Sequence, residues 1–205
     1  MPLHYYEEHM TSGAVQQLGA LSELFGEALR GCRPESVAIL GVAGGNGLER
    51  IDPVVTRRVC GIDINPEYLR AVRERHAAVP GLELHCADLA GQGIELAPVQ
   101  LVHAALIFEH AGVACCLDNA VNLVAPGGVL SVVLQLPSAS EAAVGDAARP
   151  SIQALRQSFR SIDPASLSRE IEGRGFRLVR QLRRPLASGK AFWMGLFERA
   201  RDAGR

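Results

Sequence analysis

The feature that most constrains this chain is an apolar run, Val37–Leu40, that leads directly into a glycine-rich stretch, Gly41–Gly47. The run is typical of a strand buried on both faces. Glycine is favoured where the backbone takes a positive φ angle or where a ligand approaches it closely. A helix that opens after such a turn presents free N–H groups and the positive end of its dipole. The combination indicates the first strand and turn of a nucleotide site in an open α/β sheet.

A second apolar segment, Val59–Ile62, ends in the carboxylate of Asp63, which follows Gly45 by 18 residues. An acidic residue about 20 residues beyond the glycine turn, at the end of the next strand, is placed to accept hydrogen bonds from a ribose. The alternative role for Asp63 is to cap the next helix. We favour ribose binding, because Asn65 and Pro66 already provide the cap and the first helical position.

Further apolar segments predict the rest of a sheet. Leu82–Ala87, Val99–Phe108 and Val129–Leu136 are the expected third, fourth and fifth strands. The last two, Phe176–Leu182 and Ala191–Arg199, are separated by a short loop with Pro and Gly and predict an antiparallel hairpin. The final segment is apolar on both faces, so we expect it inside the sheet rather than at an edge.

The order and spacing of these motifs resemble those of class I S-adenosylmethionine-dependent methyltransferases. The resemblance covers about residues 36–199 and rests on Gly41–Gly47, Asp63, His85–Leu89 and Leu123–Leu130. It implies an α/β fold: a three-layer, Rossmann-like sandwich whose seven-stranded sheet is mostly parallel, with an antiparallel last strand.

The resemblance also implies a cofactor, S-adenosyl-L-methionine, and a set of residues to hold it. In the family, an acidic residue at the position of Asp88 binds the adenine amino group, and the next backbone N–H, that of Leu89, binds a ring nitrogen. The alternative for Asp88 is an ordinary turn aspartate. The predicted cofactor-binding residues are Gly41, Val42, Ala43, Gly45, Asp63, Ile64, Asp88 and Leu89.

Two positions depart from the family pattern. An acidic residue often stands two positions before the first glycine, where it helps to hold the methionine end of the cofactor, and here that residue is Ile39. The middle glycine of the turn is replaced by Ala43, which is tolerable if its φ angle is negative. Glu49 and the amino-terminal cluster His4–Met10 are candidates to replace the lost carboxylate.

Glu109 and His110 follow the fourth predicted strand and are the candidate catalytic residues. The crevice of such a sheet lies outside the carboxyl ends of the strands, near the point where the strand order reverses. A base there would assist methylation of a hydroxyl or an ammonium-like nitrogen. If the strand geometry continues through the pair, only one of the two side chains faces the acceptor.

We expect one methyltransferase domain over residues 1–205, with a helical lead-in or lid at 1–35, a core at 36–199 and a substrate-covering insertion at 137–163. Within the lead-in, residues 4–30 predict one helix with a polar, aromatic cluster at its start. That cluster is either a frayed terminus or a lid over the crevice. The insertion follows the fifth strand and is rich in Ala, Ser and Pro.

The composition excludes several classes of protein. A net charge of −1 gives no reason to expect a nucleic-acid or membrane partner. The five cysteines show no spacing typical of zinc, so no metal is expected, and those in the second and third strands, Cys60 and Cys86, are expected to be buried. The chain lacks an apolar signal core and is expected in the cytoplasm, as a monomer or homodimer.

Three functions stay open. The first is a methyltransferase that acts on an O or N atom of a small molecule. The second is an NAD-dependent Rossmann oxidoreductase, for which the chain lacks a clean G-x-G-x-x-G turn and a Tyr-x-x-x-Lys pair. The third is a methyltransferase-like protein that binds S-adenosyl-L-methionine without turnover, which the loss of the acid at Ile39 favours.

Overall fold

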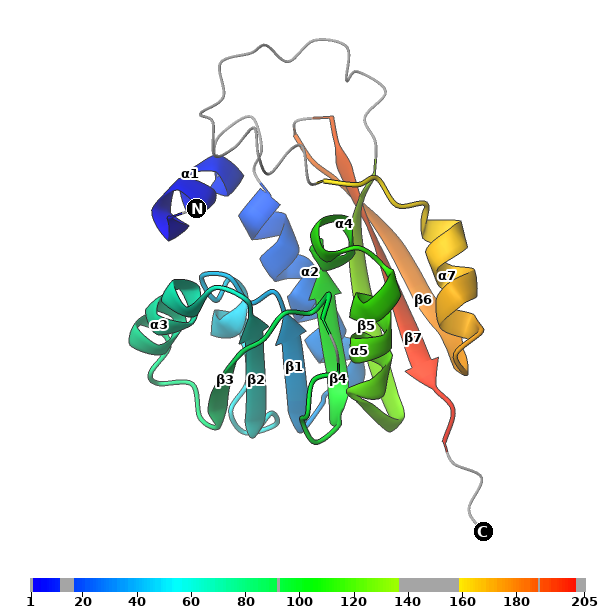
Figure 1. Cartoon of the computed structure of the whole chain (residues 1–205), viewed down its shortest axis with the longest axis horizontal. Coiled ribbons are helices and arrows are strands. Elements are labelled where there is room, and N and C mark those ends of the chain that lie inside the picture. Colours follow the sequence, from blue (N-terminus) through cyan, green and yellow to red (C-terminus); the bar gives the residue numbers. More distant parts are fainter. Residues whose placement is uncertain (1, 12–16, 92, 137–158, 188, 202–205) are drawn as a thin grey trace.

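The structure is a computed structural model that describes residues 2–11, 17–91, 93–136, 159–187 and 189–201. It contains a seven-stranded sheet with the strand order β3-β2-β1-β4-β5-β7-β6 (Figure 1). The first five strands are parallel, and β7 is antiparallel to both of its neighbours. This arrangement confirms the predicted fold, including the antiparallel last strand inside the sheet.

The central parallel strands are mostly apolar, as burial on both faces requires, whereas the edge strand β3 is only partly buried. Their bounds are β1 Ser36–Leu40, β2 Arg58–Asp63, β3 Leu82–Cys86, β4 Val99–Ala105 and β5 Val124–Leu136. In β1, all four residues from Val37 to Leu40 are buried. Alternate residues face two different hydrophobic clusters, Ala38 and Leu40 one of them and Val37 and Ile39 the other.

The carboxyl-terminal strands form the predicted hairpin. β6 runs over Phe176–Pro185 and β7 over Ala191–Arg199. Every residue from Ala191 to Phe197 is buried, which agrees with the position of β7 between β5 and β6.

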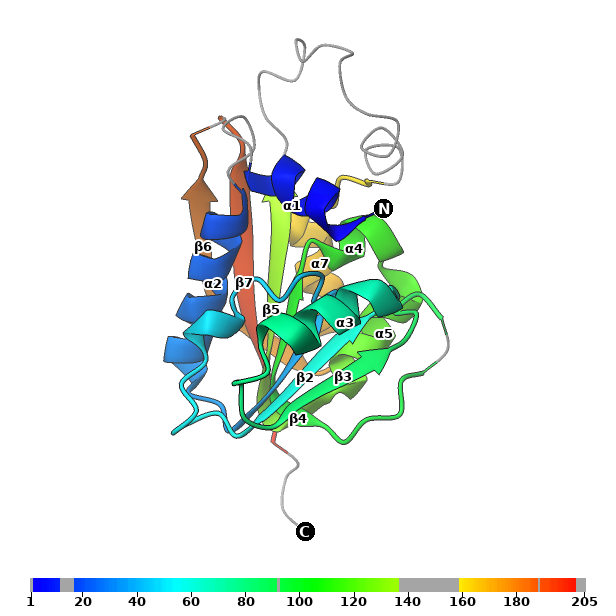
Figure 2. The same ribbon diagram turned by 90° about the vertical axis from the view of Figure 1, so that its left-hand side faces the viewer.

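Helices cover both faces of the sheet and make the sandwich three-layered (Figures 1 and 2). One hydrophobic cluster joins the sheet to α2 (Gln17–Cys32) and α3 (Pro66–Arg75). The other joins it to α5 (Ala114–Asn122) and α7 (Pro164–Glu172). Side chains cap two of these helices: Asn65, as expected, accepts the Glu67 N–H at 3.0 Å, and Asp163 accepts the Ser166 N–H at 2.9 Å.

The structure differs from the sequence prediction at the amino terminus. Residues 4–30 were expected to form one helix after a polar cluster, but two helices are present, α1 (Leu3–Thr11) and α2. The cluster is itself helical. Glu7 of α1 forms an ion pair with Arg75 of α3, a partner far along the sequence that local patterns do not reveal.

Two strand boundaries also differ. The fourth strand was expected to reach Phe108, but β4 ends at Ala105 and the short helix α4 (Ile107–Ala111) follows. The fifth strand was expected to begin at Val129, but β5 already pairs with β4 at Val124, and the ladder shifts its register before Val129. The predicted insertion, 137–163, lies mostly outside the described residues, and its role as a substrate cover stays a prediction.

Candidate active site

The exits of β1 and β4 lie side by side, where the strand order reverses. The contact between Gly41 and Ile107 shows how close they are, since a Cβ atom added to Gly41 would lie 2.9 Å from Cδ1 of Ile107. In an open α/β sheet, this reversal point is where ligands bind. The site therefore has two halves, the glycine turn beside β2 and the α4 segment beside β5.

The glycine turn is fixed to the end of β2 by its backbone. The N–H groups of Gly41 and Val42 both donate to the Ile62 carbonyl, at 2.8 and 3.0 Å. The next N–H, of Ala43, donates to Oδ2 of Asp63 at 2.9 Å. Asp63 thus joins the second strand to the turn, and the two elements form one rigid edge.

Asp63 is buried, with 7% of its surface exposed. Its other oxygen, Oδ1, accepts the Asn65 N–H at 2.9 Å. Desolvation raises the pKa of Asp63, and the N–H groups of Asn65 and Ala43 oppose that rise. An ionised carboxylate has about four acceptor positions, so two remain after these bonds. Asn65, not Asp63, caps α3, which removes the alternative role considered for Asp63.

Ala43 has a φ angle of +46°. The sequence argument allowed alanine at this position only with a negative φ, and that condition is not met. A left-handed conformation costs a non-glycine residue about 1–2 kcal/mol. The substitution therefore leaves strain in the turn, within the predicted cofactor site.

The remaining predicted cofactor residues lie along the same edge. Ile64 follows Asp63 and is 64% exposed, which is unusual for a large apolar side chain. Asp88 is exposed, and its Oδ1 accepts the Ala90 N–H at 2.9 Å, the geometry of a turn aspartate. Leu89 is buried in the core. Asp88 also lines a groove of about 520 Å³ beside the end of β3.

Glu49, one candidate to replace the acid lost at Ile39, already has partners. Its two oxygens accept the Ser22 hydroxyl at 2.6 Å and the Gly47 N–H at 2.9 Å. Burial alone would raise the pKa of Glu49, but these hydrogen bonds bring it below its usual value. Glu49 thus ties the turn to α2, while Ile39 is buried in the hydrophobic cluster on that face.

Glu109 is the most unusual group in the second half of the site. It is fully buried, its Oε1 accepts the Gln135 N–H at 2.8 Å, and its Oε2 has no hydrogen-bond partner among the described residues. Desolvation raises the pKa of Glu109 to about 7, with the Gln135 N–H opposing the rise. A carboxyl group with this pKa exchanges a proton near neutral pH.

His110 lies on the same helical turn but is exposed. Its ring packs edge-on against Phe159, with the ring centroids 5.6 Å apart, and the partial burial lowers its pKa. The strand argument for the pair, in which one side chain faces inward by alternation, was wrong because both residues belong to α4. Helical geometry nevertheless separates them, with Glu109 buried and His110 toward solvent.

The amino-terminal helix contributes to the first half of the site. The Glu7 carboxylate lies against Gly44 and leaves no room for a Cβ atom there. A second contact of the same ion pair, Arg75 Nη2 to Glu7 Oε2, measures 3.2 Å. α1 therefore lies over the glycine turn, as the lid prediction requires, and its movement with ligand stays a prediction.

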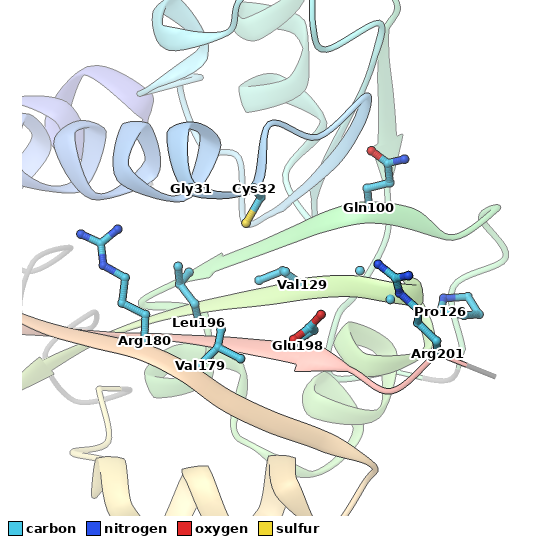
Figure 3. Close-up of a pocket in the computed structure, with 12 residues that line it drawn as sticks. Gly31, Cys32, Gln100, Pro126, Val129, Val179, Arg180, Leu196, Glu198 and Arg201 are labelled. Atoms are coloured by element: carbon cyan, nitrogen blue, oxygen red, sulfur yellow. The ribbon is translucent and has the colours of Figure 1, made fainter. Parts of the chain in front are cut away.

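A larger hollow, of about 630 Å³, lies at the opposite edge of the sheet (Figure 3). The end of α2 and the beginnings of β4 and β5 line it, and Arg180 and Arg201 lie toward its two ends. None of the predicted cofactor or catalytic residues borders this hollow. We therefore place the site at the carboxyl edge, where the glycine turn, Asp63 and Glu109 are found.

Comparison with known proteins identifies the domain. Residues 38–132 match the model of a methyltransferase domain family. This segment is a methyltransferase domain. It contains the glycine turn, Asp63, Asp88 and Glu109. The match bears out the predicted family and enzyme class over this segment, and the predicted fold is confirmed by the strand order and by solved structures.

Solved structures agree on the fold. The N-methyltransferase NodS from Bradyrhizobium japonicum WM9, in complex with S-adenosyl-L-homocysteine, has a TM-score of 0.68 and 14% identity, covering 96% of this chain and 97% of that one. The CcbJ methyltransferase from Streptomyces caelestis has a TM-score of 0.63 and 18% identity, covering 88% and 89%. No curated protein sequence matches the chain.

A third structure shows that this fold also serves other reactions. The [4+2]-cyclase SpnF has a TM-score of 0.69 and 11% identity, covering 91% of this chain and 82% of that one. The reaction must therefore be argued from the site. No helix in the described part of the chain has the length and apolar character needed to cross a membrane.

Proposed function

We propose that this protein transfers the methyl group of S-adenosyl-L-methionine to an O or N atom of a small-molecule acceptor. When bound, the cofactor supplies an activated methyl group on a sulfonium, so the chain must orient the acceptor, exclude water and control the acceptor's proton. The observation that carries the proposal is the Glu109 carboxyl, which is buried at the carboxyl edge, has a pKa of about 7, and has one oxygen without a partner among the residues that the structure describes.

The residues of the first half fit such a cofactor. Asp63 retains two acceptor positions after its bonds to Ala43 and Asn65, enough for a pair of ribose hydroxyls. The exposed Ile64 offers an apolar surface beside it, suited to one face of an adenine ring. Asp88, in the adjacent groove, supplies an acceptor for an exocyclic amino group.

Glu109 would act as the general base. Below its pKa the carboxyl group carries a proton, and above it the unpaired Oε2 can accept one from a hydroxyl or an ammonium-like nitrogen. The Gln135 N–H holds Oε1 and fixes the orientation of the group. A positioned base of this kind contributes about 10²–10⁴-fold to a rate. The exposed His110 would border the acceptor or pass the proton to solvent.

The experiment is turnover of labelled S-adenosyl-L-methionine against a metabolite extract, with the methylated product identified. We expect a labelled product of low molecular mass that carries the methyl group on O or N. Label transferred to carbon, or to protein or RNA in the extract, would contradict the acceptor class. Calorimetry with NAD as a control ligand should give no binding.

A second candidate function is cofactor binding without turnover. It is favoured by Ile39, which removes a carboxylate that the family often uses, and by the strained Ala43. Binding of S-adenosyl-L-homocysteine together with no labelled product from any extract would support this candidate over methyl transfer.

A further inference from the structure

Three potential metal ligands lie together on the β2–β3 edge and are not among the residues assigned above to the cofactor and the acceptor. Cys60 of β2 is paired in register with Glu83 of β3, and His85 follows two residues later on the same face. The Cys60 Sγ and Glu83 Oε2 atoms are 3.5 Å apart, as are the His85 Nε2 and Glu83 Oε2 atoms. All three ligand atoms lie within 4.8 Å of one another.

The two separations of 3.5 Å match a known coordination geometry. Tetrahedral zinc, with bonds of about 2.3 Å to sulfur and about 2.0–2.1 Å to nitrogen and oxygen, sets its ligand atoms about 3.3–3.6 Å apart. We propose that Cys60, Glu83 and His85 form a binding site for a zinc-like divalent cation, with the fourth position left to water or a small ligand.

The His85 ring gives independent support. Its Nε2 atom is buried and has no hydrogen-bond partner among the described residues. Buried polar atoms are nearly always paired, so an unpaired one needs an explanation. The nitrogen is 3.5 Å from the Glu83 carboxylate, so a cation bound between the two groups would satisfy it.

Arg58 holds the carboxylate in place. Its Nε donates to Glu83 Oε1 at 3.0 Å, its Nη2 donates to Oε2 at 3.1 Å, and its Nη1 donates to the Ala97 carbonyl at 3.0 Å. Carboxylates that bind metals are commonly oriented by such hydrogen bonds. The positive charge of Arg58 opposes a cation, and the negative charges of the Glu83 carboxylate and the Cys60 thiolate offset it.

Binding requires one proton to leave. The Cys60 thiol is neutral in the metal-free protein, because burial raises its pKa to about 11. As the sulfur–metal bond forms, the S–H bond breaks and the proton goes to solvent, with no change of oxidation state. The cluster lies near the surface, since the side chains of His85 and Glu83 are 32% and 42% exposed and His85 also lines the groove of about 520 Å³ beside β3.

Titration of the full-length protein with Co²⁺, which substitutes for Zn²⁺ and absorbs light, tests the site. We expect one equivalent to bind with a thiolate-to-cobalt charge-transfer band and the intense visible bands of tetrahedral coordination, both lost when Zn²⁺ is added. Cys60→Ser should abolish the charge-transfer band. His85→Gln, at a partly exposed position, should weaken Co²⁺ binding at least about tenfold.

The matched control is Cys86→Ser, which changes an exposed thiol of the same strand next to His85 and should leave both the band and the affinity unchanged. Circular dichroism confirms folding of each variant, and His85→Gln keeps the test valid if Cys60→Ser unfolds. No stoichiometric Co²⁺ binding by the native chain, or a band that follows Cys86 rather than Cys60, would overturn the proposal. Both readouts are independent of methyl transfer.

Discussion

The two halves of the candidate site each present a buried carboxylate, Asp63 at the end of β2 and Glu109 on α4, and the surroundings of these carboxylates differ. Asp63 is buried, and each of its oxygens accepts a backbone N–H, from Ala43 and from Asn65. Glu109 is buried more completely, and within the described part of the chain only one of its oxygens has a hydrogen-bond partner. Desolvation raises both pKa values, but two N–H groups from the turn and the helix start oppose it at Asp63.

This difference in surroundings suits Asp63 to the proposed cofactor binding and Glu109 to the proposed proton transfer. A carboxylate whose charge is held by backbone donors keeps its ionised form and accepts hydrogen bonds from neutral hydroxyls. A carboxyl with an unpaired oxygen in an apolar setting changes its protonation near neutral pH, as a general base must. In the proposed mechanism, the same chemical group therefore binds the cofactor in one half of the crevice and takes the acceptor's proton in the other.

The largest expected effect is on turnover. Glu109→Gln removes the base and keeps the shape, so turnover of the identified acceptor should fall about 10²–10⁴-fold. Affinity for S-adenosyl-L-homocysteine should not change. The activity of the native enzyme should rise with pH through about 7, the pKa of Glu109. His110→Gln is the control, expected to cost less than about tenfold. Full activity of Glu109→Gln from pH 5 to 9 would contradict the role of Glu109 as the general base and its contrast with Asp63.

The next effect is on cofactor affinity. Asp63→Asn replaces a charged acceptor, and each hydrogen bond to a charged group is worth about 1.5–3 kcal/mol, or about 10- to 150-fold in the dissociation constant. The thermal stability of the ligand-free protein should fall as well, since the Ala43 N–H loses its charged partner. Glu67→Gln, at an exposed position on α3, is the control. An unchanged dissociation constant for S-adenosyl-L-homocysteine would remove Asp63 from the site.

A third test uses stability against pH. Burial raises the pKa of Glu109 from 4.5 to about 7, so the folded protein binds this proton more tightly than the unfolded chain does. The stabilisation is complete below about pH 4.5 and is lost as the pH rises through 7. Between pH 4.5 and 8, the free energy of unfolding of the native protein should therefore fall by up to about 3 kcal/mol relative to that of Glu109→Gln. Denaturant unfolding of both at several pH values measures this, and parallel curves would contradict it.

The smallest effect concerns the strained turn. Ala43→Gly should stabilise the protein by about 1 kcal/mol, because glycine accepts the φ angle of +46° without strain. The melting temperature should rise by about 2–4 °C. Ala71→Gly, in the regular helix α3, should instead destabilise by about 1 kcal/mol. Equal changes at both positions would show that Ala43 carries no strain.

The sequence by itself determined the architecture and predicted that the glycine turn and Asp63 lie together at one edge of the sheet. Gly41 and Asp63 each follow an apolar run, so each is expected at the end of a strand. Parallel strands end at the same edge of a sheet, which places the two residues close together. The run Ala191–Phe197, apolar on both faces, could only be accommodated between two neighbouring strands. Asn65 was correctly predicted to cap the helix that follows it, because cap chemistry depends on residues only a few positions away.

Only the tertiary structure decided the features that depend on burial and on distant partners. The Val99–Phe108 run did not show that α4 begins at Ile107 and turns Glu109 inward while His110 stays in solvent. Cys86 was expected to be buried like Cys60, but it is exposed on β3, an edge strand. Cys60, Glu83 and His85 have no metal-binding spacing along the chain, and β-strand pairing alone brings them together. A pKa, a strained φ angle and a ligand cluster follow from three-dimensional contacts, which a one-dimensional pattern does not contain.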